Sequence, residues 1–169
     1  MINKDWEVAI IDVDHTIINN DCDVSWKLFL IDKGLASKKD QNTALKYYQL
    51  YKSGSLPIIK FLNFQLKELI GKDINYINGL ALEHFNIYVK PKVYKSAYDL
   101  INKYKQTQTK LVSISGCNDI ILKPLNDYFG FDHTISTKLE INNKKITGLL
   151  QGEYVLKNMV LSVSECRWK

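Results

Sequence analysis

Three short runs of apolar residues are the strongest pattern in the chain, and each is bounded by polar residues. Residues 7–11 and 110–115 are rich in β-branched side chains, and residues 132–137 form a third, weaker run. Runs of this length and composition predict strands that are buried on both faces. Such strands are typical of a parallel sheet covered by helices, so the pattern predicts an α/β protein.

The long segment between the first two strands predicts helices alone. Their expected starts are marked by residues that cap helices or open the first turn, and most of their expected ends by glycines. The predicted starts lie near Val24, Ser37, Ser55 and Asp73, followed by Pro91 for the helix that leads into the second strand. A further helix near residues 119–129 follows the second strand, and Asn142-Asn143 predicts a hairpin turn.

The order of these elements predicts the domain organisation. Strands that alternate with helices imply right-handed crossovers and a parallel sheet. We therefore expect a three-layer Rossmann-like core formed by residues 1–19 and 91–169, with residues 20–90 inserted as an all-helical cap subdomain. Ligands bind at the carboxyl ends of the strands in such sheets, so this edge is where chemistry is expected.

Composition adds limits to this picture. The chain has 169 residues, 46% hydrophobic and 24% charged, and no apolar stretch approaches the ~20 residues that span a bilayer. The net charge of +5 comes from scattered lysines with Arg167 as the one arginine, which favours solvated lysine surfaces over a nucleic-acid site. The N-terminus does not resemble a secretory signal, which predicts a cytoplasmic protein without a membrane partner. Three irregularly spaced cysteines argue against a disulfide framework and a structural zinc site.

The most informative segment follows the first strand directly, as Asp12-Val13-Asp14. Two carboxylates this close repel each other unless a cation lies between them, and Mg²⁺ prefers hard oxygen ligands. One carboxylate could attack phosphorus, and the other could protonate the leaving oxygen and later activate water. The alternative is a turn in which these side chains only satisfy backbone groups. The position at the end of an apolar strand favours chemistry.

The second strand ends in Ser115-Gly116, shortly before a predicted helix. A hydroxyl and free backbone N–H groups at a helix start suit a phosphate group. A serine that merely caps the helix is the alternative. Because the carboxyl ends of parallel strands share one edge, Ser115 and Asp12 are expected to converge on one pocket.

An apolar strand followed by Asp12-x-Asp14-x-Thr16, a helical insert, and a second strand ending in Ser115 resembles the haloacid dehalogenase superfamily. The similarity is greatest to its phosphoserine phosphatase-like branch, subclass IB. It covers nearly the whole chain and includes Asp12 to Gly34, Pro124 and Gly130. This resemblance implies a Mg²⁺-dependent phosphomonoester hydrolase that acts on a small phosphorylated metabolite.

The resemblance also implies roles for individual residues. Asp12 would be the nucleophile and would bind Mg²⁺ through its side chain. Asp14 would be the acid/base and would offer its backbone carbonyl to the metal. Ser115 and Gly116 would hold the phosphoryl oxygens. Lys157 is the nearest candidate for the lysine that neutralises charge between nucleophile and phosphate, although a surface lysine is the alternative reading.

The sequence departs from the family pattern near its C-terminus. The acidic pair that completes the Mg²⁺ shell, and the strand that carries it, have no counterpart before Lys169. The departure implies a truncated or degenerate member with impaired activity. The absent strand would flank residues 8–11, so we expect an exposed sheet edge there and a homodimer paired through it.

Two other functions compete with a working phosphatase. The first is a catalytically inactive remnant that binds phosphate or a partner protein. The second is a receiver domain, which also phosphorylates an aspartate, but the helical insert after the first strand disfavours it. A cysteine phosphatase is disfavoured because Lys123 stands where Cys117 would require an arginine. A nucleotide P-loop is disfavoured because its motif is absent.

Overall fold

A parallel sheet forms the centre of the computed structural model, which describes residues 7–107 and 109–155. Its strands, in the spatial order β1–β2–β3, are β1 (Val8–Asp12), β2 (Lys110–Asn118) and β3 (His133–Thr137). Both strand pairs are parallel, as the apolar runs predict. The α/β fold class with a Rossmann-like parallel sheet is confirmed.

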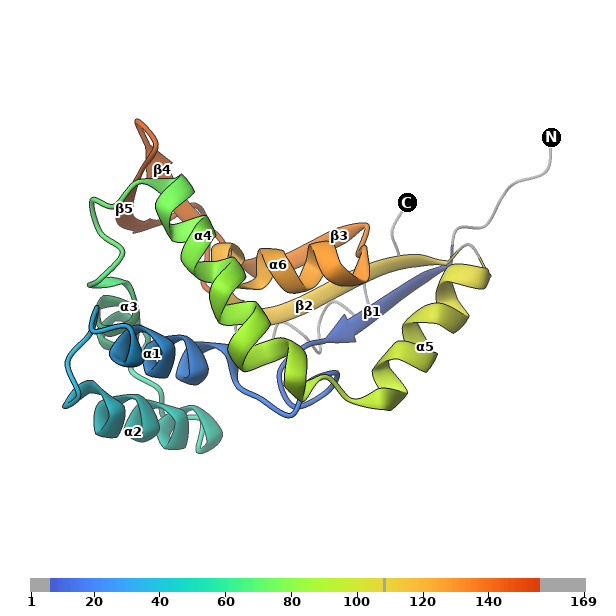
Figure 1. The fold of residues 1–169 in the computed structure, drawn as a ribbon, viewed down its shortest axis with the longest axis horizontal. Coiled ribbons are helices and arrows are strands. Elements are labelled where there is room, and N and C mark those ends of the chain that lie inside the picture. Colours follow the sequence, from blue (N-terminus) through green and yellow to red (C-terminus); the bar gives the residue numbers. More distant parts are fainter. Residues whose placement is uncertain (1–6, 108, 156–169) are drawn as a thin grey trace.

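Helices fill the connections between the strands. They are α1 (Cys22–Asp32), α2 (Asp40–Lys52), α3 (Ile58–Leu66), α4 (Ile74–His84), the π-helical turn η1 (Phe85–Val89), the 3-10 turn η2 (Lys90–Lys92), α5 (Lys95–Gln106) and α6 (Asp119–Phe129). A hairpin of β4 (Leu139–Asn142) and β5 (Lys145–Leu150) follows β3. In Figure 1, α1 to α3 lie beyond the end of the sheet toward which β1 points, whereas α5 and α6 lie along the strands.

A capping contact explains one of the predicted helix starts and lies close to a second. The Asp73 carboxylate accepts a hydrogen bond from the Asn75 N–H at 2.8 Å and caps α4. Before α2, the Asp40 carboxylate accepts the Ser37 N–H at 3.2 Å, but α2 begins only at Asp40, with Lys39 at its N-cap position and no side-chain cap. The Asp73 side chain therefore locates the start of α4, whereas the predicted start at Ser37 lies one turn before that of α2.

Two other predicted starts are wrong. Ser55 does not cap α3, which begins at Ile58 without a side-chain cap. Pro91 does not open α5 but lies within η2, where the turns after α4 continue the helical path. Val93 is extended, with ψ 129°, and this break restarts the helix at Lys95. Proline suits the first turn of either kind of helix, so the sequence does not separate them.

One continuous hydrophobic core joins the inserted helices to the sheet. Its fully buried members include Trp26 and Phe29 of α1, Ile101 of α5, Leu111 of β2 and Leu122 of α6. Full burial of each such side chain stabilises the fold by about 1.5–3 kcal/mol. Residues 22–92 are helices and the turns between them, in agreement with the predicted helical insert. The division into a core and a cap subdomain stays a prediction.

β1 lies at an edge of the sheet among the residues that the structure describes. It pairs with β2 alone there, and Val8 is 37% exposed. Pairing of two copies along this edge stays a prediction. In the described part of the chain, no helix combines the length and the apolar character needed to cross a membrane.

Gly148 on β5 should tolerate no side chain. Its φ is +91°, and an added Cβ would lie 2.8 Å from Cγ1 of Ile70, in the turn between α3 and α4. Gly148→Ala should lower the free energy of unfolding by about 2–4 kcal/mol, from left-handed strain plus overpacking. Chemical denaturation measures this loss.

Gly54→Ala is the matched control. Gly54 also has a positive φ, +71°, but an added Cβ would meet nothing within 4 Å. It should cost only the strain, about 1–2 kcal/mol. Equal losses in the two variants would contradict the close packing of the hairpin on Ile70.

Candidate active site

The carboxyl ends of β1 and β2 bring the predicted site residues together. Asp12 is the last residue of β1 and lies opposite Ile114 in the parallel register, so Ser115 follows one position further along β2. The Val13 N–H donates to the Ile114 carbonyl at 3.1 Å and extends this pairing by one residue. Asp14 therefore enters the loop beside Ser115, although 101 positions separate the two in the sequence.

The Asp14 carboxylate is the centre of this arrangement. Oδ1 accepts a hydrogen bond from the Cys22 N–H at 2.7 Å. Oδ2 accepts one from the Ser115 hydroxyl at 2.7 Å and a longer one from the Cys117 thiol at 3.4 Å. Its partners come from the start of α1 and the end of β2, so one side chain fastens the helical insert to the sheet.

Asp12 precedes Asp14 by two positions in the chain, but its carboxylate has different contacts. Its Oδ2 accepts a hydrogen bond from the Thr16 hydroxyl at 2.6 Å. His15 is exposed and has a positive φ of +59°, which turns the chain sharply between Asp14 and Thr16. The His15 Nε2 lies 3.1 Å from the Tyr48 hydroxyl on α2. His15 thus lies beside the two aspartates and contacts the insert.

Ser115 is buried and does not cap the helix that follows it. The cap of α6 is Asn118, whose side-chain oxygen accepts the Ile121 N–H at 3.1 Å. The Ser115 hydroxyl instead donates to Asp14 and accepts the Cys117 N–H at 3.1 Å. The simple reading of Ser115 as a helix cap is therefore wrong.

Gly116 allows a close approach of the chain beyond the hairpin. A Cβ on Gly116 would lie 3.1 Å from the Val155 carbonyl oxygen and 3.6 Å from the Tyr154 hydroxyl. Its own carbonyl accepts a hydrogen bond from the Thr137 hydroxyl at 2.8 Å. A larger residue here would push residues 154 and 155 away from the site.

Two further acidic side chains lie near Asp14. Burial and the Asp14 charge raise the pKa of Asp21 to about 6, although the Val24 N–H that its carboxylate accepts opposes the shift. Burial and the charges of Asp21 and Asp14 also raise the pKa of Asp23 well above its ordinary value. Carboxylates gathered in this way attract a cation or a cationic substrate group.

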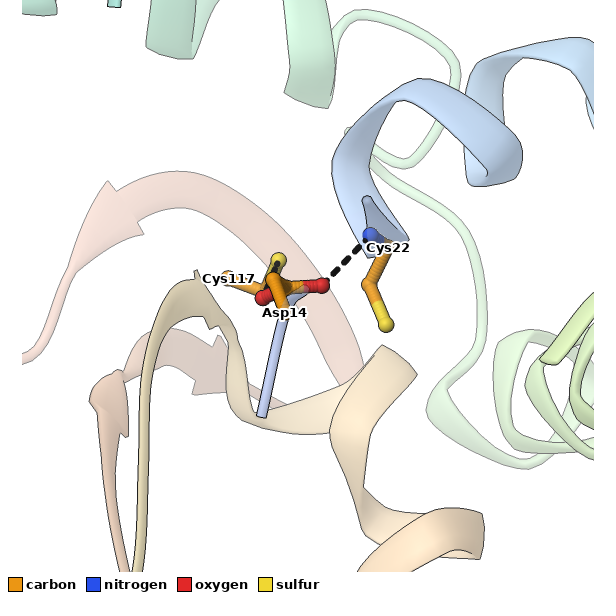
Figure 2. Close-up of side chains that lie close together, drawn as sticks. All are labelled: Asp14, Cys22 and Cys117. Atoms are coloured by element: carbon orange, nitrogen blue, oxygen red, sulfur yellow. Dashed lines mark hydrogen bonds between the residues drawn. The ribbon is translucent and has the colours of Figure 1, made fainter. Parts of the chain in front are cut away.

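Two buried cysteines flank the Asp14 carboxylate, as Figure 2 shows. The two thiols interact: Cys117 lowers the pKa of Cys22, but burial and the Asp14 charge outweigh this and raise it to about 12. The contact with Cys22, burial and the Asp14 charge raise the pKa of Cys117. Both thiols are therefore protonated at neutral pH.

The sequence did not indicate two tyrosines near these groups. Burial and the charges of Asp12 and Asp14 raise the pKa of Tyr51, on α2, to about 12. Burial and the charge of Asp23 raise the pKa of Tyr154. No motif in the sequence marks either residue. Lys157, the predicted phosphate-binding lysine, lies outside the described residues.

A parallel α/β sheet with carboxylates and a buried serine at the carboxyl ends of adjacent strands defines a class of enzymes that bind ligands at this edge. The particular family follows from comparison with known proteins. The chain belongs to the haloacid dehalogenase-like hydrolases, whose family pattern it matches over residues 9–164.

Two curated relatives carry phosphatase names. The chain is 31% identical to histidinol-phosphatase of Neisseria meningitidis serogroup C over 151 residues, which is 88% of this chain and 66% of that protein. It is 27% identical to phosphoserine phosphatase of Archaeoglobus fulgidus over 90 residues, 53% of this chain and 26% of that protein. The chain thus spans slightly under two thirds of the first relative and about a quarter of the second.

Solved structures share the fold at lower sequence identity. A Bordetella pertussis Tohama I protein of unknown function has a TM-score of 0.81 at 21% identity, over 95% of this chain and 73% of that chain. A phospho-aspartyl intermediate analogue of phosphoserine phosphatase has a TM-score of 0.63 at 18% identity, over 96% and 72%. These likenesses support the fold assignment.

Asp21→Asn should stabilise the protein at neutral pH. The pKa of Asp21 is about 6 in the folded state against 3.8 ordinarily, so the folded state binds this proton more tightly. The ionised carboxylate therefore costs stability as the pH rises from about 4 to about 6. Asparagine removes the charge and keeps a capping oxygen, so the free energy of unfolding at pH ~7.5 should rise by about 1–2 kcal/mol.

Denaturation of both proteins at pH ~7.5 and at pH ~4 measures this difference, which should vanish at the lower pH. Asp73→Asn is the matched control, because Asp73 caps α4 from an exposed position. It should change stability by less than ~0.5 kcal/mol at either pH. An Asp21→Asn effect of equal size at both pH values would contradict the buried-charge account.

Proposed function

We propose that this protein is a phosphatase that hydrolyses a small phosphorylated metabolite through a phosphoryl group carried on Asp12. The observation that supports this most is the place of Asp12 at the end of β1, beside an Asp14 carboxylate held by Ser115. The proposed nucleophile, the acid/base and the phosphate-binding hydroxyl then lie together at the carboxyl ends of two adjacent strands. The names of the curated relatives support the same class of reaction.

In the first step, an Asp12 carboxylate oxygen attacks phosphorus, and the bond from phosphorus to the substrate oxygen breaks. Asp14 in its protonated form gives its proton to that leaving oxygen. In the second step, Asp14 takes a proton from water, and the resulting hydroxide attacks phosphorus and releases Asp12. The hydrogen bonds from the Cys22 N–H and the Ser115 hydroxyl orient the Asp14 carboxylate for both transfers.

The donors at the strand ends fit Mg²⁺. The Asp12 carboxylate and the Asp14 backbone carbonyl are hard oxygen ligands, and Mg²⁺ proteins often use only one or two carboxylates besides phosphate oxygens and water. When bound, Mg²⁺ would neutralise charge on the phosphoryl oxygens. Asp12 would be one ligand through its side chain, and this leaves the side chain of Asp14 available for proton transfer.

Ser115 and Gly116 complete the proposed phosphate site. The Ser115 hydroxyl donates to Asp14 in the present arrangement, so a bound phosphoryl group would compete for the same donor. Gly116 supplies a backbone N–H without a side chain in a place where residues 154 and 155 approach closely. Lys157 is proposed as the neutralising cation on its sequence position alone.

We propose further that the substrate carries a positive group beside its phosphate. Burial and the charge of Asp14 raise the pKa of both Asp21 and Asp23, so both side chains lie near Asp14, and Asp21, with a pKa of about 6, adds a negative charge there at neutral pH. Such a setting repels a purely anionic ligand and favours an ammonium group. Histidinol and serine, in the names of the two curated relatives, both carry an amino group.

Asp12→Asn should abolish Mg²⁺-dependent release of phosphate from a small phosphomonoester. The amide keeps the shape of the side chain but is a poor nucleophile and a weak Mg²⁺ ligand. We expect kcat to fall at least about a thousandfold, which corresponds to ~4 kcal/mol of lost transition-state stabilisation. A colorimetric phosphate assay, with and without Mg²⁺, measures this.

Asp127→Asn is the matched control, since Asp127 is exposed on α6 and pairs with Lys123 at 2.6 Å. It should leave the rate unchanged. Equilibrium binding of inorganic phosphate, measured in parallel, identifies the competing function. Phosphate binding by a folded chain that shows no turnover would contradict the phosphatase and favour an inactive binding protein.

Asp21→Asn should change the KM of substrates differently according to whether they carry a positive charge. For phosphoethanolamine, KM should rise about tenfold, the equivalent of ~1.4 kcal/mol for one lost charge pair. For ethyl phosphate, which lacks the amine, KM should stay the same or fall because a repulsive charge is gone. An equal change of KM for both substrates would contradict recognition of an ammonium group by Asp21.

A further inference from the structure

Three potential metal ligands of mixed chemistry meet at the start of α1. They are the Asp14 carboxylate and the thiols of Cys22 and Cys117, and one ligand atom of each lies within 4.8 Å of the other two. They come from three parts of the chain: the loop after β1, the first residue of α1 and the end of β2. Figure 2 shows the carboxylate lying between the two cysteine side chains.

We propose that the side chains of Asp14, Cys22 and Cys117 form a binding site for a thiophilic divalent cation such as Zn²⁺ or Cd²⁺, with ligand atoms other than those proposed for Mg²⁺. Bound metal would replace the two thiol protons, which pass to solvent. Thiolate sulfur selects soft metals, whereas Mg²⁺ takes oxygen ligands. The two kinds of cation therefore use different atoms, because Mg²⁺ would use the backbone carbonyl of Asp14 and the soft metal its carboxylate.

The distances suit this assignment. Zn–S bonds of about 2.3 Å and Zn–O bonds of about 2.0–2.2 Å place the ligand atoms of a tetrahedral site roughly 3.3–3.8 Å apart. The Cys117 sulfur and Asp14 Oδ2 are already 3.4 Å apart, and all three atoms lie within 4.8 Å. Closing the remaining distance needs side-chain movements of about 1 Å. Three protein ligands leave one position for water, as in open zinc sites.

The surroundings hold the ligands in place. The Cys22 N–H donates to Asp14 Oδ1, and the Cys117 N–H donates to the Ser115 hydroxyl, which in turn donates to Asp14 Oδ2. Hydrogen bonds of this kind orient metal ligands and contribute to affinity. Cys22 is 1% exposed and Cys117 4%, so the two thiolate ligands would themselves be shielded from competing chelators.

This site would make soft metals inhibitors of the enzyme. A metal bound to the Asp14 carboxylate prevents this carboxylate from giving or taking a proton. Hydrolysis then stops although the nucleophile Asp12 is intact. This consequence rests on the proposed function, whereas metal binding does not. The test therefore measures binding first and inhibition second, so that failure of one can be told from failure of the other.

The experiment titrates Cd²⁺ into the full reduced chain in a large excess of Mg²⁺ and follows the ultraviolet charge-transfer band of cadmium thiolates. The wild type should bind one Cd²⁺ with two thiolates. Cys22→Ser and Cys117→Ser should each halve the band and weaken binding at least about tenfold, since even loss of a partner behind the ligands costs roughly 10–100-fold. Asp14→Asn should keep the full band with weaker affinity.

Cys166→Ser is the matched control, because the proposed site uses only the other two cysteines of the chain. It should bind Cd²⁺ as the wild type does. Thermal unfolding with and without Cd²⁺ provides a second readout for each variant that folds. Cd²⁺ should raise the Tm of the wild type and of Cys166→Ser, but much less that of the other cysteine variants.

Absence of the band, or a band that Cys22→Ser and Cys117→Ser leave unchanged, would overturn the proposal. So would a Cys22–Cys117 disulfide that forms readily in a chain whose reduced form ignores Cd²⁺, because the pair would then be a redox couple. If binding is found, Cd²⁺ should also inhibit hydrolysis, and Cys117→Ser should relieve this inhibition. Inhibition of equal strength in that variant would assign it to another site.

Discussion

The hydrogen bonds of the Asp14 carboxylate are the interaction on which the rest of the site depends. Parallel pairing of β1 with β2 brings the loop after Asp12 against Ser115, and Asp14 then accepts donors from β2 and from the first residue of α1. A partly buried carboxylate needs such donors, since a buried charge without hydrogen bonds is costly. The same contacts that stabilise this charge also fix the position of the helical insert relative to the sheet.

This arrangement concentrates negative charge, and the concentration links stability to function. Asp21 and Asp23 lie where the charge of Asp14 adds to the effect of burial on their pKa values. The ionised carboxylates of these residues are therefore less stable in the folded protein than in the unfolded chain. Such costs are common where a site binds a cation or transfers protons. The two thiols beside Asp14 add ligands of a different chemistry to the same few ångströms.

Local patterns in the sequence predict the strands, the end of α6 at Gly130 and the residues Asp12, Asp14 and Ser115, because each depends on nearby residues. The turns around Pro91 could not be predicted, since proline fits the first turn of either helix type. The proximity of Cys22, Cys117 and Tyr51 to Asp14 depends on how α1 and α2 pack against the sheet, which sequence spacing does not encode. The irregular cysteine spacing in the sequence argues against a structural zinc site. In the folded chain, however, the thiols of Cys22 and Cys117 lie close together beside Asp14.

The central claim is that Asp12 carries the phosphoryl group during turnover, and covalent trapping tests it most directly. The chain is mixed with a phosphomonoester and Mg²⁺ and quenched with borohydride, which reduces an acyl phosphate to an alcohol. Peptide mass spectrometry then locates the reduced residue. The account predicts conversion of Asp12 to homoserine, dependent on substrate and Mg²⁺. Turnover in which another residue is reduced, or in which no reduced residue is found, would contradict the account.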